Sequence, residues 1–270
     1  MVTHTSVTVT DLPVGTEITL SVTALANDTL KGDTVTVVSY TAPEPISNLI
    51  LVTKHNSLTA QWDSVGNQNF TVHLKLHNEL VGNCNVTNTT KQFDGLKTAS
   101  KYTVIVFSVS GNHRSQEKQE SAFTLPLSPT NVKVNYSNSS QISLEWGAPD
   151  NIENASYLVN MSSSFWNQSW SVPVSNQKTH RFNDLISGTN YTLSVQTMAG
   201  ELLSEPVNVS HFTDARKVEI GLSMLCSSAE SLFCDMNSTR HEVFQKLNEH
   251  FNNLLQDHVF WELKKEQTDN

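Results

Sequence analysis

Asn-x-Ser/Thr triplets are the pattern in this sequence most suited to covalent chemistry, because the amide of their asparagine accepts N-linked glycans. The 270-residue chain carries twelve such triplets, whereas about six are expected by chance from its Asn, Ser and Thr content. The acceptors are Asn27, Asn69, Asn85, Asn88, Asn135, Asn138, Asn154, Asn160, Asn167, Asn190, Asn208 and Asn237. This excess predicts a glycan-covered surface and a chain that passes through the secretory pathway.

The chain has three cysteines, and an odd number cannot all pair within one chain. Cys226 and Cys234 enclose a short loop, so in an oxidising compartment we expect them to form a disulfide bond. Cys84 is either a buried free thiol or half of a bond to a partner outside the sequence. It has no neighbouring histidine or basic cluster, and therefore lacks the surroundings of an activated nucleophile.

His241 and Glu242 begin a His-Glu-x-x-His zinc motif, but Gln245 occupies the place of the second histidine. His250 follows His241 by nine residues, which is the wrong spacing for one helix face. The sequence contains no nucleophile elbow, phosphate-binding loop, dinucleotide fingerprint or calcium-loop spacing. We therefore predict that the chain is not an enzyme and that it uses no metal and no cofactor.

The composition excludes several other classes of protein. Charged residues make up 16% of the chain, and the net charge of −9 argues against a nucleic-acid partner, which needs basic residues to neutralise phosphates. The sequence has neither an apolar run long enough to span a bilayer nor a signal peptide at its start. We expect an internal segment of a longer exported protein, which would contact the membrane only through a segment outside this chain.

An internal repeat organises most of the sequence. Trp62 and Trp146 stand in matching contexts 84 residues apart. A second signature occurs three times, at residues 12–18, 96–102 and 185–191, and each copy leads into alternating apolar and polar residues. Because such alternation is typical of half-buried strands, the repeat predicts a mainly β protein made of tandem β-sandwiches.

The repeated Trp and the signature Leu-x-x-Gly-Thr-x-Tyr together resemble fibronectin type III repeats, a family of immunoglobulin-like sandwiches. The resemblance implies that Trp62 and Trp146 anchor two cores and that Tyr102 and Tyr191 form the tyrosine corner of each repeat. It also implies complete repeats at residues 42–124 and 125–213, joined by proline-containing segments. Residues 1–41 match only the C-terminal part of such a repeat, with Ile18 in place of the corner tyrosine.

Three further aromatic residues, Phe165, Trp166 and Trp170, lie close together in the last repeat. If they gather at the surface, they form a candidate contact site for a protein partner. A glycan on the neighbouring Asn167 would compete with that role.

Residues 214–270 depart from the repeat. Alternation at 218–224 and 259–263 predicts two strands, and apolar spacing over 239–256 predicts an amphipathic helix that begins with a Thr239/Glu242 capping box. This order is similar to the start of a SEA module, and the segment is accordingly expected to be a partial α/β module. A helical juxtamembrane spacer is the alternative.

These features favour a non-enzymatic, N-glycosylated extracellular segment that supplies adhesion modules and a stalk to a single-pass cell-surface receptor. Irregular repeats with many glycan triplets resemble the ectodomains of receptor-type tyrosine phosphatases, although the phosphatase signature loop is absent here. The implied partners are protein ligands or neighbouring cell-surface and matrix proteins. The alternative is a secreted matrix or mucin-like structural glycoprotein in which the repeats are spacers.

Overall fold

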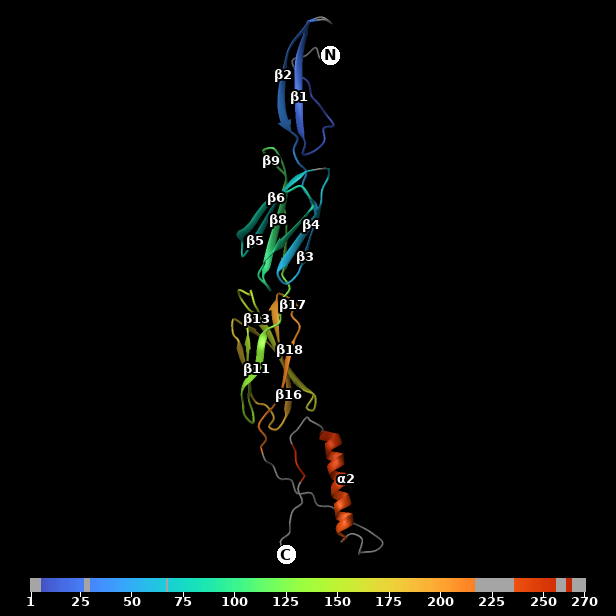
Figure 1. Cartoon of the computed structure of the whole chain (residues 1–270), viewed down its shortest axis with the longest axis vertical. Coiled ribbons are helices and arrows are strands. Elements are labelled where there is room, and N and C mark those ends of the chain that lie inside the picture. The colour runs from blue at the N-terminus through green and yellow to red at the C-terminus, as the bar shows by residue number, and fades with distance from the viewer. Residues whose placement is uncertain (1–5, 27–29, 67, 217–235, 256–260, 264–270) are drawn as a thin grey trace. The chain divides into compact units, whose positions relative to one another are not determined.

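A computed structural model describes residues 6–26, 30–66, 68–216, 236–255 and 261–263. The chain divides into two compact units, the first comprising Met1–Leu127, Asp150–Asn154 and Ala199–Leu202, and the second the remaining residues. The described residues form strands throughout both units and one helix, α2 (Asn237–Leu255), near the C-terminus (Figure 1). The predicted mainly β fold class, with tandem sandwiches of fibronectin type III form, is confirmed. The boundaries of the four predicted domains stay a prediction.

The sandwich of the first unit pairs a three-stranded sheet with a larger one. The smaller sheet has the order β3-β4-β7, with β3 (Ser47–Thr53), β4 (Ser57–Asp63) and β7 (Thr90–Asp94). The larger sheet has the order β10-β8-β5-β6, with β10 (Lys118–Phe123), β8 (Lys101–Ser110), β5 (Asn69–Leu76) and β6 (Glu79–Val86); β9 (His113–Arg114) also pairs with β8.

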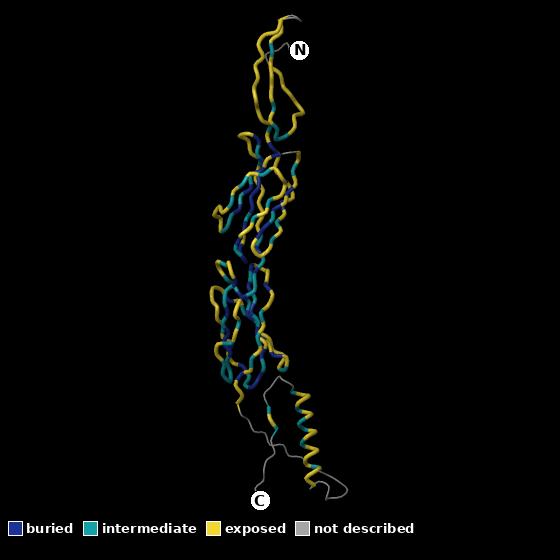
Figure 2. Tube along the Cα trace, viewed as in Figure 1, coloured by how far each residue is buried: buried dark blue, intermediate teal, exposed yellow. Residues whose placement is uncertain are grey.

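The second unit repeats this plan. Its smaller sheet has the order β11-β12-β15, with β11 (Thr130–Ser137), β12 (Ile142–Gly147) and β15 (Thr179–Phe182). Its larger sheet has the order β14-β13-β16-β17, with β14 (Gln168–Ser175), β13 (Ser156–Ser163), β16 (Asn190–Ala199) and β17 (Leu202–Leu203); β18 (Val207–Phe212) also pairs with β16. Along β13 and β16, buried residues alternate with less buried ones, as the colours of Figure 2 indicate.

Each sandwich encloses one core because alternate side chains of its strands point inward. Trp62 is 3% exposed and meets the Phe70 ring edge-on at a centroid distance of 5.4 Å. Trp146 is 4% exposed and meets Tyr157 in the same way at 5.3 Å. The repeated Trp therefore sits in the same aromatic pair in both units.

The signature before β8 and β16 builds the same corner twice. The Tyr102 hydroxyl accepts a hydrogen bond from the Lys97 backbone N–H, and the Tyr191 hydroxyl accepts one from that of Ile186, both at 3.0 Å. Two residues before each tyrosine, a threonine or serine hydrogen-bonds a threonine at the end of the last strand, as Thr189 does with Thr213. The corner is thus braced by two hydroxyls in each sandwich.

Strands β1 (Glu17–Ala26) and β2 (Leu30–Tyr40) form an antiparallel hairpin. One of its faces is apolar, yet Leu20 is 41% exposed and Val22 is 68% exposed. The residues 84 positions later, Val104 and Val106, are fully buried. The interpretation of residues 1–41 as the C-terminal part of a repeat stays a prediction.

The tail matches its sequence pattern in part. Helix α2 is present, but the predicted capping box at Thr239 is wrong: the carbonyl of Met236 accepts the first helical hydrogen bond, from Arg240, so Thr239 lies inside the first turn. Trp261 packs its ring against Phe251 at 5.7 Å, and the described residues 261–263 form no strand. The predicted strand at 218–224 and the Cys226–Cys234 disulfide lie outside the described residues.

Candidate glycan acceptor surface

The structure separates the predicted glycan acceptors by accessibility. Three of them, Asn138, Asn160 and Asn190, are half-buried. The exposed acceptors are Asn69, Asn85, Asn88, Asn135, Asn154, Asn167, Asn208 and Asn237, and Asn27 lies outside the described residues. A bulky glycan requires a surface position, so the exposed set fits the modification better.

Two of the exposed triplets face each other across β5 and β6. A two-residue turn, His77 and Asn78 with φ of +49° and +69°, connects the strands, and a β-bulge at Leu74/Lys75 shifts their register by one residue. As a result Thr71 pairs with Asn85, and the Thr71 hydroxyl donates a hydrogen bond of 2.8 Å to the Asn85 side-chain oxygen. Thr71, the third residue of the Asn69 triplet, therefore positions Asn85, the acceptor of the other triplet, by a hydrogen bond.

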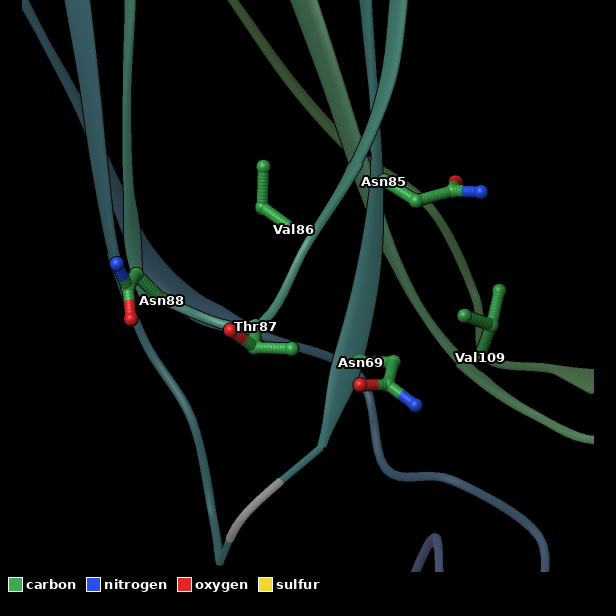
Figure 3. Close-up of a pocket in the computed structure, with 6 residues that line it drawn as sticks. All are labelled: Asn69, Asn85, Val86, Thr87, Asn88 and Val109. Carbon is green, nitrogen blue, oxygen red and sulfur yellow. The ribbon is translucent and has the colours of Figure 1, made fainter.

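A depression of about 460 Å³ lies at this end of the sheet. It is lined by three acceptor asparagines and three neighbours, namely Asn69, Asn85, Asn88, Val86, Thr87 and Val109 (Figure 3). In the figure the side chains of Asn69 and Asn85 point to the same side as Val109, and Val86 points away from them. This end of the sheet thus presents several acceptor amides around one hollow.

Beside the acceptors, β8 presents a strip of apolar side chains on the outer face of the sheet. Ile105 and Phe107 are 4% and 8% exposed, although they alternate with the core residues and belong to no core cluster. His73 meets the Phe107 ring edge-on at 5.4 Å, and the Arg114 guanidinium lies 5.9 Å from its centroid. These two side chains cover Phe107 from the solvent side, a feature that the alternation along β8 did not predict.

Asn160 lies in a different environment. It sits in the middle of β13, where its side-chain oxygen accepts a hydrogen bond of 2.6 Å from Ser171 and its amide nitrogen donates one of 3.3 Å to Ser194. Both ends of its amide thus join neighbouring strands. Asn190 has a buried side-chain oxygen with no hydrogen-bond partner among the described residues.

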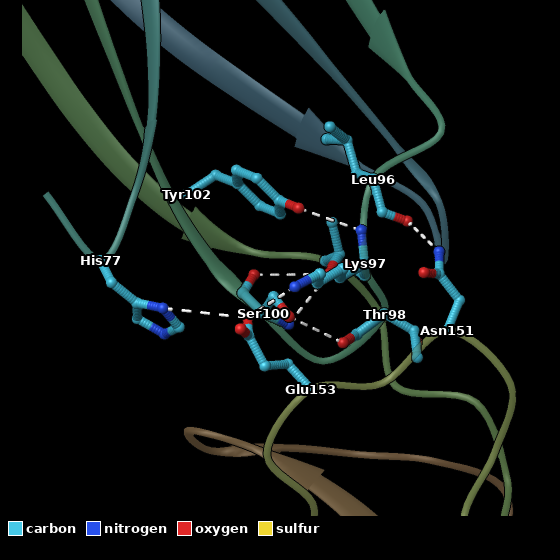
Figure 4. Close-up of polar contacts among 9 residues, drawn as sticks. His77, Leu96, Lys97, Thr98, Ser100, Tyr102, Asn151 and Glu153 are labelled. Carbon is cyan, nitrogen blue, oxygen red and sulfur yellow. Dashed lines mark hydrogen bonds and ion pairs between the residues drawn. The ribbon is translucent and has the colours of Figure 1, made fainter. Parts of the chain in front are cut away.

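A polar cluster in the first unit involves residues 150–154 and the segment before β8 (Figure 4). The Asn151 side-chain amide donates to the Leu96 carbonyl at 2.8 Å, and the Asn151 carbonyl accepts from the Thr98 N–H at 3.0 Å. Lys97 and His77 approach the Glu153 carboxylate at 3.0 and 3.9 Å. Ion pairs as exposed as these contribute about 0–1 kcal/mol each to the free energy of unfolding. The two hydrogen bonds of Asn151 to backbone groups indicate that the cluster positions residues 150–154 against the segment before β8.

The aromatic residues proposed for partner contact do not share one environment. Trp166 is 42% exposed, donates a hydrogen bond of 3.0 Å to the Thr189 hydroxyl and meets Phe165 edge-on at 4.8 Å. Trp170 is half-buried and packs against the core with its ring 6.2 Å from Tyr191. Their role in partner contact stays a prediction, and Trp166, the most exposed of the three, is the main candidate.

Among the described residues, Cys84 stands apart from other reactive side chains. Cys84 is a half-buried free thiol on the inner side of β6, with its sulfur 3.8 Å from the Val72 carbonyl oxygen. Within the described residues, no group of three His, Cys, Asp or Glu side chains is close enough to hold a metal ion. No helix in that part of the chain has the length and apolarity needed to cross a membrane.

Residues 127–210 match the family model of the fibronectin type III domain. This segment is a fibronectin type III domain. The chain is also similar to a segment of two fibronectin type III domains from chicken tenascin, with 16% identity, a TM-score of 0.49, and coverage of 63% of this chain and 99% of that one. The FN1–FN3 domains of chicken CNTN1 share 18% identity at a TM-score of 0.33, over 73% of this chain and 77% of theirs.

The family match covers the second unit's sandwich, and the first unit's sandwich has the same strand order. The braced corner and the buried Trp are therefore framework features.

Proposed function

We propose that the chain is an N-glycosylated extracellular segment whose fibronectin type III repeats serve as adhesion modules and as the stalk of a single-pass cell-surface receptor. The observation that carries this proposal is the exposure of seven acceptor asparagines on a repeated sandwich framework, with an eighth at the start of α2. Glycans keep such a surface soluble, and the loops and outer sheet faces between them remain available to protein ligands.

Secretion of the 270-residue chain from mammalian cells behind a heterologous signal peptide tests the proposal directly. We expect a soluble glycoprotein whose mass falls on enzymatic removal of N-glycans. A chain that is folded and secreted without any glycan contradicts the proposal.

The finer assignment, to an ectodomain similar to those of receptor-type tyrosine phosphatases with a partial SEA-like module at 214–270, belongs to the same proposal. Sequencing of the complete transcript tests it, and we expect a membrane-spanning segment and phosphatase motifs downstream. Release of the full-length product into the medium or the insoluble matrix would instead favour the structural glycoprotein.

A further inference from the structure

We propose that N-linked glycans on Asn69 and Asn85 lie over the outer apolar strip of β8, and that Asn160 is not a glycan acceptor. This inference rests on the proposed function, because both require passage through the secretory pathway. It goes further in three ways. It assigns two neighbouring glycosylation sites and the surface that their sugars cover, and it identifies one triplet that the folded structure keeps from being modified.

The placement of the two acceptors follows from strand register. Asn69 pairs with Val109, and the next outward residue, Thr71, pairs with both Asn85 and Phe107. Asn69 and Asn85 are therefore diagonal neighbours on the outer face, about 7–8 Å apart. Asn69 on β5 stands directly beside Val109, which continues the outer apolar strip of Ile105 and Phe107 along β8. Asn85 on β6 lies one strand farther away, with Thr71 of β5 between it and Phe107.

The amides of both acceptors are available for the reaction. Among the described residues, none of the observed hydrogen bonds uses the side-chain nitrogen of Asn69 or Asn85; the one bond to Asn85 uses its oxygen. In the transfer, this nitrogen gives up a proton and bonds to the anomeric carbon of a lipid-pyrophosphate oligosaccharide, while the lipid pyrophosphate leaves with the electrons of the broken C–O bond. The Asn85 oxygen is unchanged, so its hydrogen bond from Thr71 persists.

The surface next to the acceptors suits a sugar ring. One face of the first N-acetylglucosamine carries C–H groups that gain dispersion contacts when they lie against apolar side chains. Val109 is half-buried at this place and Phe107 retains 8% exposure, so a residual apolar surface remains beside Asn69. Covering it removes apolar area from water and stabilises the sandwich.

Asn160 provides the contrast within the same chain. A glycan on its nitrogen would grow from an inner strand of the sheet and would replace one of the two N–H groups of the amide that donates to Ser194. The bond from Ser171 at 2.6 Å fixes the amide in that orientation. The side chain therefore acts as a bridge across three strands.

Site-by-site occupancy is measured by glycopeptide mass spectrometry of the full chain secreted from mammalian cells. We expect glycan on Asn69 and Asn85 in most molecules and unmodified Asn160. If other triplets are occupied but Asn69 and Asn85 are not, or if Asn160 is occupied, this inference is wrong while the proposed function stands. Absence of glycan from every triplet would contradict the proposed function itself.

The packing role is measured by thermal unfolding of single variants of the full chain. Asn69→Gln keeps Thr71 and its hydrogen bond, and should lower the melting temperature of the first unit by about 4 °C. Asn88→Gln is the matched control, because it removes a glycan from the same depression but not from the strip, and should leave that temperature unchanged. Trimming with an endoglycosidase that leaves one N-acetylglucosamine should also leave it unchanged. Equal melting of both variants and the parent would overturn the packing role.

Discussion

The Thr124 hydroxyl accepts a hydrogen bond of 3.0 Å from the Ser100 backbone N–H and donates one of 2.7 Å to the Lys97 carbonyl. Thr213 makes the equivalent bonds to Thr189 and Ile186, and Thr41 makes them to Thr16 and Pro13. The same arrangement therefore occurs three times in the chain. In each, a threonine directly after a strand hydrogen-bonds the corner at which the preceding strand begins.

Thr124→Val should destabilise the first unit by about 1–3 kcal/mol, because the side chain keeps its shape but leaves a buried N–H and a carbonyl unpaired. Thr103→Val is the control, since the Thr103 hydroxyl meets only Ser121 on the exposed face. Urea unfolding of both variants gives the comparison. If the two variants are equally stable, the hydrogen bonds of the Thr124 hydroxyl contribute nothing to stability beyond the packing of the side chain.

Ala99 occupies the position that glycine holds in the other two signatures. Its φ is +51°, against +59° for Gly15 and +65° for Gly188, and a side chain in this left-handed region is strained. Ala99→Gly should therefore stabilise the first unit by roughly 0.5–1 kcal/mol, and Gly188→Ala should destabilise the second by a similar amount. Chemical denaturation that finds Ala99→Gly destabilising would contradict this account.

Trp146→Ala should cost roughly 3–5 kcal/mol, because it empties a large buried site and removes the aromatic contact with Tyr157. We expect calorimetry to show an early transition for the second unit and a nearly unchanged one for the first. Trp62→Ala should give the reverse pattern. Simultaneous loss of both transitions in either variant would contradict the assignment of the two residues to separate cores.

Burial lowers the pKa of His180 from its usual 6.5. Below that value the unfolded chain binds a proton more readily than the folded one, so the free energy of unfolding of the second unit should fall as the pH drops from 7.5 to 5.5. His180→Gln should flatten this dependence. Denaturant titrations at several pH values measure both slopes, and equal slopes would refute the role of His180.

The sequence by itself determined the framework. Alternation of apolar and polar residues identified the strands, and the recurrence of Trp and of the Leu-x-x-Gly-Thr-x-Tyr signature marked the two sandwiches, because both signals are written in short stretches of chain. The three threonines that lock the corners were missed. An aromatic residue followed by threonine, 24 or 25 positions after the signature's Thr or Ser, is the signal that could have found them.

Only the tertiary structure decided how the acceptor asparagines relate to one another. The bulge at Leu74/Lys75 moves Thr71 opposite Asn85; without that one-residue shift it would face Cys84, and the acceptor would point to the other side. Asn160 reads as an ordinary triplet until β14 and β16 bring Ser171 and Ser194 to its amide. Register between strands is set by pairing and bulges over many residues, so no single triplet contains the information that makes it an acceptor or a bridge.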